Sequence, residues 1–416
     1  MITRTFSLRE GHRVFRNVIC VILLTFIVVH VILPAVSISP RSRRLVLHKF
    51  GYKSPVETRC AGVISRMIDI DILQHKSKDV NQVQGNGRKV NDHKVTDENV
   101  LEIKDADDGG TINRSVASLK LCPEFPRHTV GEMKCVCEPV TPEDILSIWP
   151  NLQLGGRLPP LTCTARERLA IIIPYSDRAS HLHKLIHNLL PVLERQNIDA
   201  TFFVIEQTTP SIFNRATLLN IGYLESQKIA NFDCYIFHDV DLVPLDDRIF
   251  YRCDDNPRHF PVSIQRHGEK EAKLMYSEYY GGVIAMTKRQ YIDVNGHSNL
   301  YFGWGGEDDD ILQRILNKGY LRTRQHPEIF KYRMLQHERN DMSRGNVDRM
   351  LLLQEAVDRQ DFEGLCTTKY KVEQTRFHRL YIWISVSLNM SQILLTSPDF
   401  TLHAIKSLLE ISKTVR

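Results

Sequence analysis

Residues 169–174 read Leu-Ala-Ile-Ile-Ile-Pro, a short continuous apolar run. Such a run is typical of a strand that is buried on both faces of a sheet. Further strands are predicted at residues 201–206 (TFFVIE) and 234–238 (CYIFH), and helices at residues 181–194 (HLHKLIHNLLPVLE) and 214–226 (NRATLLNIGYLES), with Asn214 as a cap. This β-α-β-α-β order predicts an α/β fold with a largely parallel central sheet.

Two acids follow the third predicted strand directly, with Val240 between Asp239 and Asp241. Alternate residues of an extended segment point to the same side, so both carboxylates can face one pocket. Ligands of parallel sheets bind beyond the carboxyl ends of the strands. An Asp-x-Asp sequence there could hold a divalent cation that neutralises a diphosphate leaving group, although two acids in a loop are more often merely solvated.

Two other sequences favour a ligand site over a solvated loop. Phe213 and Arg215 lie upstream, where Arg215 could grip a phosphate and Phe213 could pack on a base. Met334 and His337 lie downstream, three residues apart in Met-Leu-Gln-His. Taken separately, Met334 would be an ordinary core residue and His337 an ordinary exposed histidine.

The most acidic stretch, residues 303–310, reads Gly-Trp-Gly-Gly-Glu-Asp-Asp-Asp. Adjacent acids repel each other, and a chain seldom concentrates them unless cations or polar ligands offset the charge. One interpretation is the first turn of a helix, where acids complement the helix dipole. That interpretation leaves the glycines unexplained. We therefore expect a loop that moves over a substrate with Trp304 as its lid, and one carboxylate that acts as a general base.

The composition is that of an ordinary globular protein, with 416 residues, 25% of them charged, and a net charge of +5. No Lys/Arg tract is interleaved with aromatics, so nucleic-acid binding is not expected. Residues 18–36 form an apolar run close to the ~20 residues that cross a bilayer, and we predict a transmembrane signal-anchor there, behind a cytoplasmic tail at residues 1–17. A cleaved signal peptide is the alternative.

Residues 37–118 are predicted to be a largely disordered stem. No Phe, Trp or Tyr occurs between Tyr52 and Phe125, so this stretch has too little apolar surface to offset its ordering entropy. Of the nine cysteines, eight lie outside the apolar run and would face an oxidising lumen, where disulfides form. Glycosylation sequons at Asn113 and Asn389 agree with that location.

Five strings together resemble the β-1,4-galactosyltransferase family, glycosyltransferase family 7: FNRATLLNIGY (213–223), FHDVDLVP (237–244), YYGGVIAM (279–286), YFGWGGEDDD (301–310) and RMLQH (333–337). The resemblance covers about residues 120–390. It implies a GT-A fold, which is an α/β, Rossmann-like nucleotide-sugar-binding fold with a mostly parallel central sheet, behind a transmembrane helix and a flexible stem. It also implies a single-pass type II Golgi membrane protein with a lumenal catalytic domain (residues 119–390) and a C-terminal tail (residues 391–416).

The resemblance assigns roles to individual positions. Asp241, Met334 and His337 correspond to Mn²⁺ ligands, Asp308 to the catalytic base, and Glu307 to a contact of the transferred sugar. The other expected donor and acceptor contacts are Pro174, Tyr175, Asp177, Arg178, Phe213, Arg215, Asp239, Val240, Tyr279, Trp304, Gly306 and Asp309. The family's two disulfides correspond to Cys122–Cys163 and Cys234–Cys253, while the partners of Cys60, Cys135, Cys137 and Cys366 stay open.

The reaction implied is an inverting, Mn²⁺-dependent transfer of galactose from UDP-galactose to the 4-hydroxyl of a terminal GlcNAc-type acceptor, on a glycoprotein or glycolipid. In the family, a bulky Tyr at position 279 accompanies UDP-galactose because a filled pocket rejects extra atoms. The nearest alternative is the same fold with UDP-GalNAc as donor. A metal-dependent phosphohydrolase and an inactive glycan-binding relative are further alternatives.

Overall fold

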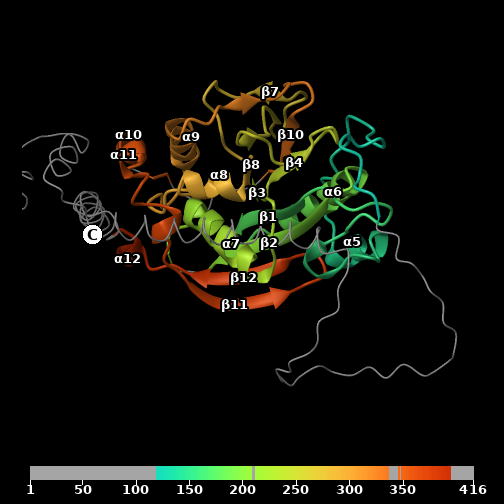
Figure 1. Ribbon diagram of the computed structural model, residues 1–416, viewed down its shortest axis with the longest axis horizontal. Helices are drawn as coiled ribbons and strands as arrows, with labels where there is room; N and C mark the ends of the chain where they lie inside the picture. The colour runs from blue at the N-terminus through green and yellow to red at the C-terminus, as the bar shows by residue number, and fades with distance from the viewer. Residues whose placement is uncertain (1–118, 209–210, 337–344, 347, 395–416) are drawn as a thin grey trace, which may run out of the picture. The chain divides into compact units, whose positions relative to one another are not determined.

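The centre of the structure is an eight-stranded sheet with the strand order β11-β12-β2-β1-β3-β8-β5-β9 (Figure 1). The computed structural model describes residues 119–394 apart from 209–210, 337–344 and 347, all within one compact unit. The strands of this sheet are β1 (Arg168–Tyr175), β2 (Asp199–Gln207), β3 (Cys234–His238), β5 (Arg258–His259), β8 (Val283–Thr287), β9 (Thr323–Arg324), β11 (Lys371–Phe377) and β12 (Ile382–Ser387).

A second, four-stranded sheet has the order β4-β10-β6-β7. Its strands are β4 (Leu242–Pro244), β6 (Ser263–Gln265), β7 (Lys273–Leu274) and β10 (Lys331–Met334). The helices of the described residues are α5 (Pro142–Ile148), α6 (Ala179–Arg195), α7 (Arg215–Ile229), α8 (Lys288–Asp293), α9 (Glu307–Asn317), α10 (Arg349–Gln354), α11 (Ala356–Arg359) and α12 (Met390–Leu394), with short 3-10 turns η2 (Leu154–Gly156) and η4 (Leu365–Thr367).

The predicted β-α-β-α-β order is confirmed in β1, α6, β2, α7 and β3. The side chain of Asn214 accepts a hydrogen bond from the Thr217 N–H, as a helix cap does. The expectation of a largely parallel sheet is right for its centre and for the edge pair β5–β9. Strands β12, β2, β1 and β3 pair in parallel, whereas β3–β8, β8–β5 and β11–β12 pair antiparallel. The sheet is therefore mixed. Strand β8 reaches it only after the chain has formed β4 to β7 and runs antiparallel to its neighbours, and β11 forms a hairpin with β12.

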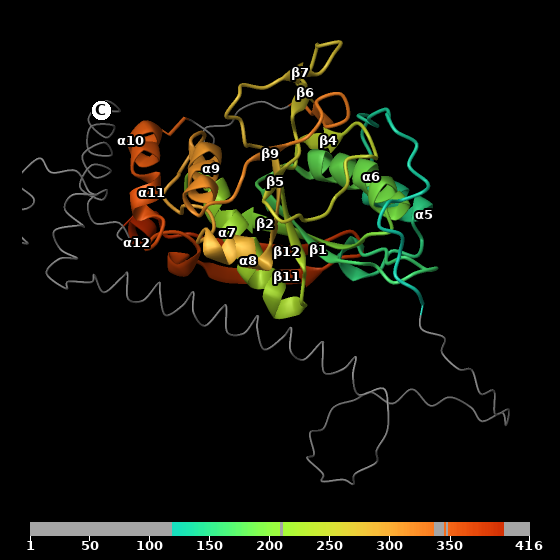
Figure 2. The ribbon, with the colours of Figure 1, turned by 45° about the horizontal axis from the view of Figure 1, so that its top comes forward.

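Each face of the central sheet is covered by its own hydrophobic core. Alternate residues of β1 separate onto the two faces, with Ile171 and Ile173 in the core that includes α6, and Ala170 and Ile172 in the core that includes α7. All four are fully buried. Figures 1 and 2 both place α9 beside α10 and α11, toward one end of the sheet.

Both family-type disulfides are present, Cys122–Cys163 and Cys234–Cys253. Cys135 pairs with Cys137, and Cys366 is also disulfide-bonded. Within the described ranges, no helix is long and apolar enough to cross a membrane. The predicted tail (1–17), anchor (18–36) and stem (37–118) lie outside those ranges, and α12 runs across the predicted boundary between residues 390 and 391.

Candidate active site

The acidic segment after β3 connects the two sheets. The Asp239 N–H donates to the Gly282 carbonyl (2.9 Å), and the Asp241 carbonyl accepts from the Leu335 N–H (2.8 Å). Strands β4 and β10 pair antiparallel with Leu242 opposite Met334. The structure thus brings Asp241 next to Met334, two of the three predicted metal ligands. The third, His337, lies outside the described residues.

Arg215 joins the donor side of the site to the acidic helix. It is the first residue of α7, and its Nε lies 2.6 Å from Asp239 Oδ1 while its Nη1 lies 2.8 Å from Asp308 Oδ1. Nη1 also lies 3.7 Å from Glu307 Oε1. One guanidinium therefore draws together acids that are distant in the sequence, including the predicted catalytic base.

The four consecutive acids, Glu307 to Asp310, form the first turn of α9. Gly306 caps this helix at φ +92°, a left-handed conformation that favours glycine over a residue with a Cβ. The helix-turn interpretation therefore holds for all four acids. Asp310 is 1% exposed and forms ion pairs with two arginines, so it has a structural role. Glu307, Asp308 and Asp309 remain on the side of the site.

Gly281, for which the sequence predicted no role, leaves room for the side chains of Asp308 and Tyr279. A Cβ on Gly281 would lie 2.5 Å from Asp308 Oδ2 and 2.9 Å from Tyr279 Cε2, closer than nonbonded atoms can approach. The predicted base and the predicted donor-selecting tyrosine therefore flank one glycine. The Tyr-Tyr-Gly-Gly string was the signal that could have identified it.

The Trp304 loop lies at the surface of the site. Trp304 is 55% exposed, and the glycines on either side have positive φ angles. The Trp304 carbonyl accepts from the Asn346 N–H at 3.0 Å, and Trp304 forms a bridge with Gly345. Tyr276 donates its hydroxyl to Asp309 Oδ1 at 3.4 Å. The loop is thus joined to the segment that follows the predicted ligand His337.

The predicted nucleotide contacts lie at the carboxyl end of the central strands. Pro174 and Tyr175 end β1, and Arg178 precedes α6 as its N-cap. Asp177 has φ +46°, an uncommon conformation for a residue with a side chain, of the kind that clusters at functional sites. Phe213 packs against the α7-side core and Val240 against the α6-side core. The roles of all these residues stay predictions.

The site carries more acids than cations. Burial raises the pKa of Glu307 to about 8, the charge of Asp308 adds to this, and Arg215 opposes it. Burial likewise raises the pKa of Asp239 to about 7, against Arg215. Glu307 Oε2 is buried and has no hydrogen-bond partner among the described residues. This excess of carboxylates around a single guanidinium suits a bound cation.

The donor set bears on which cation fits. No group of three His, Cys, Asp or Glu side chains that could hold a metal ion occurs in the ranges the structure covers. Asp241 supplies a carboxylate, the ligand that hard divalent cations such as Mn²⁺ prefer, and Met334 beside it supplies a softer thioether. The two fit a divalent cation that is completed by further donors.

Comparison with known proteins identifies the class as a glycosyltransferase. Residues 122–254 match the model of the N-terminal region of glycosyl transferase group 7, and residues 263–338 match that of the N-terminal domain of galactosyltransferase. β-1,4-Galactosyltransferase 4 of Cricetulus griseus is 41% identical over 266 residues, 64% of this chain and 76% of that protein. The chain belongs to the β-1,4-galactosyltransferase family.

Two other comparisons concern a relative and a solved structure. A β-N-acetyl-D-glucosaminide β-1,4-N-acetylglucosaminyltransferase of Lymnaea stagnalis is 47% identical over 197 residues, 47% of this chain and 40% of that protein. The crystal structure of the catalytic domain of Drosophila β1,4-galactosyltransferase 7 in complex with xylobiose is 25% identical, with a TM-score of 0.45, covering 53% of this chain and 94% of that chain.

Proposed function

We propose that this chain is an inverting β-1,4-galactosyltransferase with a GT-A-type fold, which moves galactose from UDP-galactose to the 4-hydroxyl of a terminal GlcNAc-type acceptor. The observation that carries the proposal is the position of Asp308, which flanks Gly281 together with Tyr279 and forms an ion pair with Arg215, at the carboxyl edge of the sheet. A base, a cation and a bulky ring in contact suit proton removal, phosphate binding and sugar selection.

In this mechanism the acceptor hydroxyl forms a bond to the anomeric carbon while the bond from that carbon to UDP breaks. Asp308 takes the hydroxyl proton, and UDP leaves with the electron pair. Attack opposite the leaving group converts an α-linked donor into a β-linked product. Arg215 can turn to the donor phosphates, which would release the Asp308 oxygen that it binds in this structure.

Asp241, Met334 and His337 are the residues that would hold Mn²⁺. When bound, the ion supplies Lewis-acid stabilisation of the charge that develops on the departing diphosphate. Its positive charge would also offset the negative charge of the Asp239 and Glu307 carboxylates, which share the guanidinium of Arg215. Removing the ion with a chelator should therefore abolish transfer.

The location of the enzyme is part of this proposal, and the disulfides bear on it. We propose a type II membrane protein of the Golgi, with residues 1–17 cytosolic, residues 18–36 as anchor and the catalytic domain in the lumen. The disulfides of the catalytic domain support an oxidising compartment. Its acceptors would be GlcNAc-terminated glycoproteins or glycolipids.

A second candidate donor is an N-acetylated UDP-sugar, UDP-GalNAc or UDP-GlcNAc. The name of the Lymnaea relative favours this alternative, because that protein is described as an N-acetylglucosaminyltransferase. The partly buried Tyr279 ring beside Gly281 argues for galactose, since it occupies space that an N-acetyl group would need.

Purified full-length protein with Mn²⁺ and a GlcNAc acceptor distinguishes these functions. We expect UDP release from UDP-galactose to depend on the acceptor, and to exceed release from either N-acetylated donor by at least tenfold. Equal UDP release without acceptor would indicate a phosphohydrolase, and faster turnover of an N-acetylated donor would assign the second candidate.

A further inference from the structure

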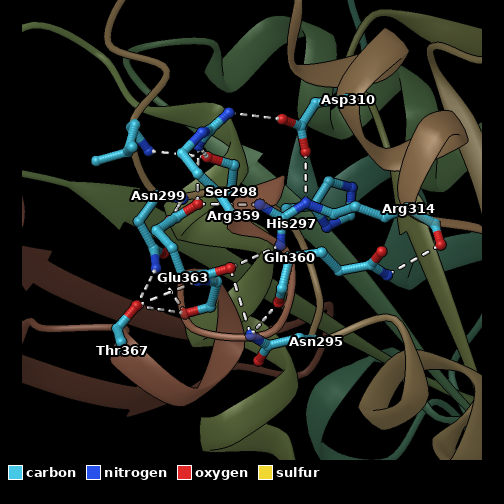
Figure 3. Close-up of polar contacts among 12 residues, drawn as sticks. Asn295, His297, Ser298, Asn299, Asp310, Arg314, Arg359, Gln360, Glu363 and Thr367 are labelled. Atoms are coloured by element: carbon cyan, nitrogen blue, oxygen red, sulfur yellow. Dashed lines mark hydrogen bonds and ion pairs between the residues drawn. The ribbon is translucent and has the colours of Figure 1, made fainter. Parts of the chain in front are cut away.

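Four charged side chains from α9 and from the segment around α11 lie buried together (Figure 3). This buried quartet consists of Asp310, Arg314, Arg359 and Glu363, each at most 3% exposed. Asp310 Oδ1 lies 2.5 Å from Arg314 Nε, and Asp310 Oδ2 lies 3.1 Å from Arg359 Nη2. The quartet thus holds the acidic turn of α9 against α11.

Glu363 connects the quartet to the segment around Asn299, which Arg359 also reaches by donating from Nη1 to Ser298 Oγ (3.1 Å). Its Oε2 accepts from Arg314 Nη2 (2.9 Å) and Arg359 Nη1 (3.1 Å). Its Oε1 accepts from the backbone N–H of Asn299 (2.6 Å). Both carboxylate oxygens are therefore used, one on the α9 side and one on the segment that leads to the Trp304 loop.

The segment around Asn299 also holds the start of α7. The Asn299 carbonyl accepts from Asn214 Nδ2 at 2.8 Å, and Asn214 Oδ1 accepts from the Thr217 N–H at 2.9 Å as the helix cap. Arg215 follows directly. Asn299 therefore links two helix starts. It bonds directly to Asn214 at the start of α7, and it connects to the acidic turn of α9 indirectly, through Glu363 and the two arginines.

We infer that Glu363 is a positioning residue for the transfer reaction, which sets the spacing between Arg215 and Asp308 through Asn299 and the buried quartet. Burying four charges costs desolvation free energy that their attraction only about offsets, so stability alone is a weak reason for such a network. Holding the reacting groups in a fixed geometry is a better reason for the network, because a displacement of about 1 Å can reduce turnover about 100-fold. The inference rests on the proposed function.

The test replaces Glu363 by Gln in the full-length protein. The amide keeps the size of the side chain but removes its charge and replaces one of its two accepting oxygens by an N–H donor. It cannot accept from the Asn299 N–H and from both guanidiniums as the carboxylate does. We expect kcat for galactose transfer to fall by about 10- to 100-fold, while the KM for UDP-galactose and the affinity for UDP change by less than about threefold, since the donor contacts are not removed. The conservative variant Glu363→Asp should recover part of the lost kcat.

A matched control is Glu225→Gln, which removes another buried carboxylate. Glu225 lies on the later part of α7, where it pairs with Lys228 and accepts a hydrogen bond from Tyr370. It should lower the thermal midpoint and leave kcat within about twofold of wild type. A second variant, Asn214→Thr, keeps a capping oxygen but loses the bond to Asn299, and it should also lower kcat selectively.

Folded Glu363→Gln and Asn214→Thr variants that both keep wild-type kcat would overturn the inference, as would an equal loss of kcat in Glu225→Gln. Should Glu363→Gln fail to fold, the Asn214→Thr variant alone is the test, and wild-type kcat in that variant would overturn the inference. Wild-type protein that transfers no sugar would instead overturn the proposed function, and the inference with it.

Discussion

At the scale of single residues, the site is a cluster of acids held by one arginine. Asp239, Asp241 and Asp308 could be selected from the sequence because runs of acids beside glycine and aromatic residues are unusual. Gly281 could have been selected only through its Tyr-Tyr-Gly-Gly string, and Glu363 could not, because its importance lies in what it touches across the fold. Nothing in the local sequence indicates that a Cβ at position 281 would meet Asp308.

Glu307 should make stability depend on pH. Its pKa is raised from 4.5 to about 8, chiefly by burial, so between about pH 5 and 7 the native protein holds a proton that the unfolded chain has released. Stability must then fall as pH rises through this window. We expect the free energy of unfolding of metal-free wild type, minus that of Glu307→Gln, to fall by up to about 1.4 kcal/mol per pH unit.

Urea unfolding of both proteins from pH 5 to 8 measures this difference. Subtracting the variant cancels the titration of the buried histidines, which both proteins share. A difference that stayed flat, or that rose with pH, would contradict the assigned direction.

Tyr279 should decide the donor. Replacing it by Leu opens space beside Gly281, so transfer from UDP-GalNAc should rise at least tenfold relative to transfer from UDP-galactose. Competition between the two donors, measured as the ratio of kcat/KM, reports the change. An unchanged ratio in a folded variant would show that the ring does not limit the donor pocket.

At the scale of elements, the sequence predicts those strands and helices that are long and have a clear hydrophobic pattern. The strands at β1, β2 and β3 and the helices α6 and α7 were all predicted from apolar runs and periodicity, and each begins and ends near its predicted bounds. The strands of two or three residues, such as β5 and β9, have no period to detect. For this reason the short strands beyond β8 were not predicted.

The turn between Tyr279 and β8 should be intolerant of any side chain at Gly281. In Gly281→Ala the new methyl group must displace the Asp308 carboxylate or the Tyr279 ring. We expect kcat to fall at least tenfold because the base is moved from its position. Steady-state kinetics check this.

Gly268→Ala serves as the comparison for this element, because a Cβ there meets nothing within 4 Å. Its φ of +80° disfavours a side chain, so stability should fall slightly while kcat stays near wild type. Similar kinetics in the two alanine variants would contradict the role given to Gly281.

At the scale of the whole molecule, covalent links and buried charges join segments that the sequence keeps apart. The pairing of Cys234 with Cys253 was predicted only through the family resemblance, and that of Cys135 with Cys137 was not predicted at all. Neither could follow from spacing alone, since eight cysteines outside the apolar run allow many connectivities. The buried quartet could not be predicted from the sequence either, because its members come from α9 and from the segment around α11.

The disulfides should differ in their effect on stability. Cys234 and Cys253 close a loop with a sequence separation of 19, so replacing both by Ala should lower the free energy of unfolding by about 3 kcal/mol. Cys135 and Cys137, only 2 apart, constrain the unfolded chain far less, and the same replacement there should cost clearly less. Denaturant unfolding of both double variants measures this, and equal losses would contradict the loop-length argument.

The central claim is that Asp308 removes the proton from an acceptor hydroxyl during sugar transfer. Its most direct test is the Asn variant at this position, assayed for galactose transfer from UDP-galactose to a GlcNAc acceptor with Mn²⁺, together with UDP binding. The account predicts that kcat falls by about 10²- to 10⁴-fold while UDP still binds. Undiminished turnover in the Asp308→Asn enzyme would contradict it.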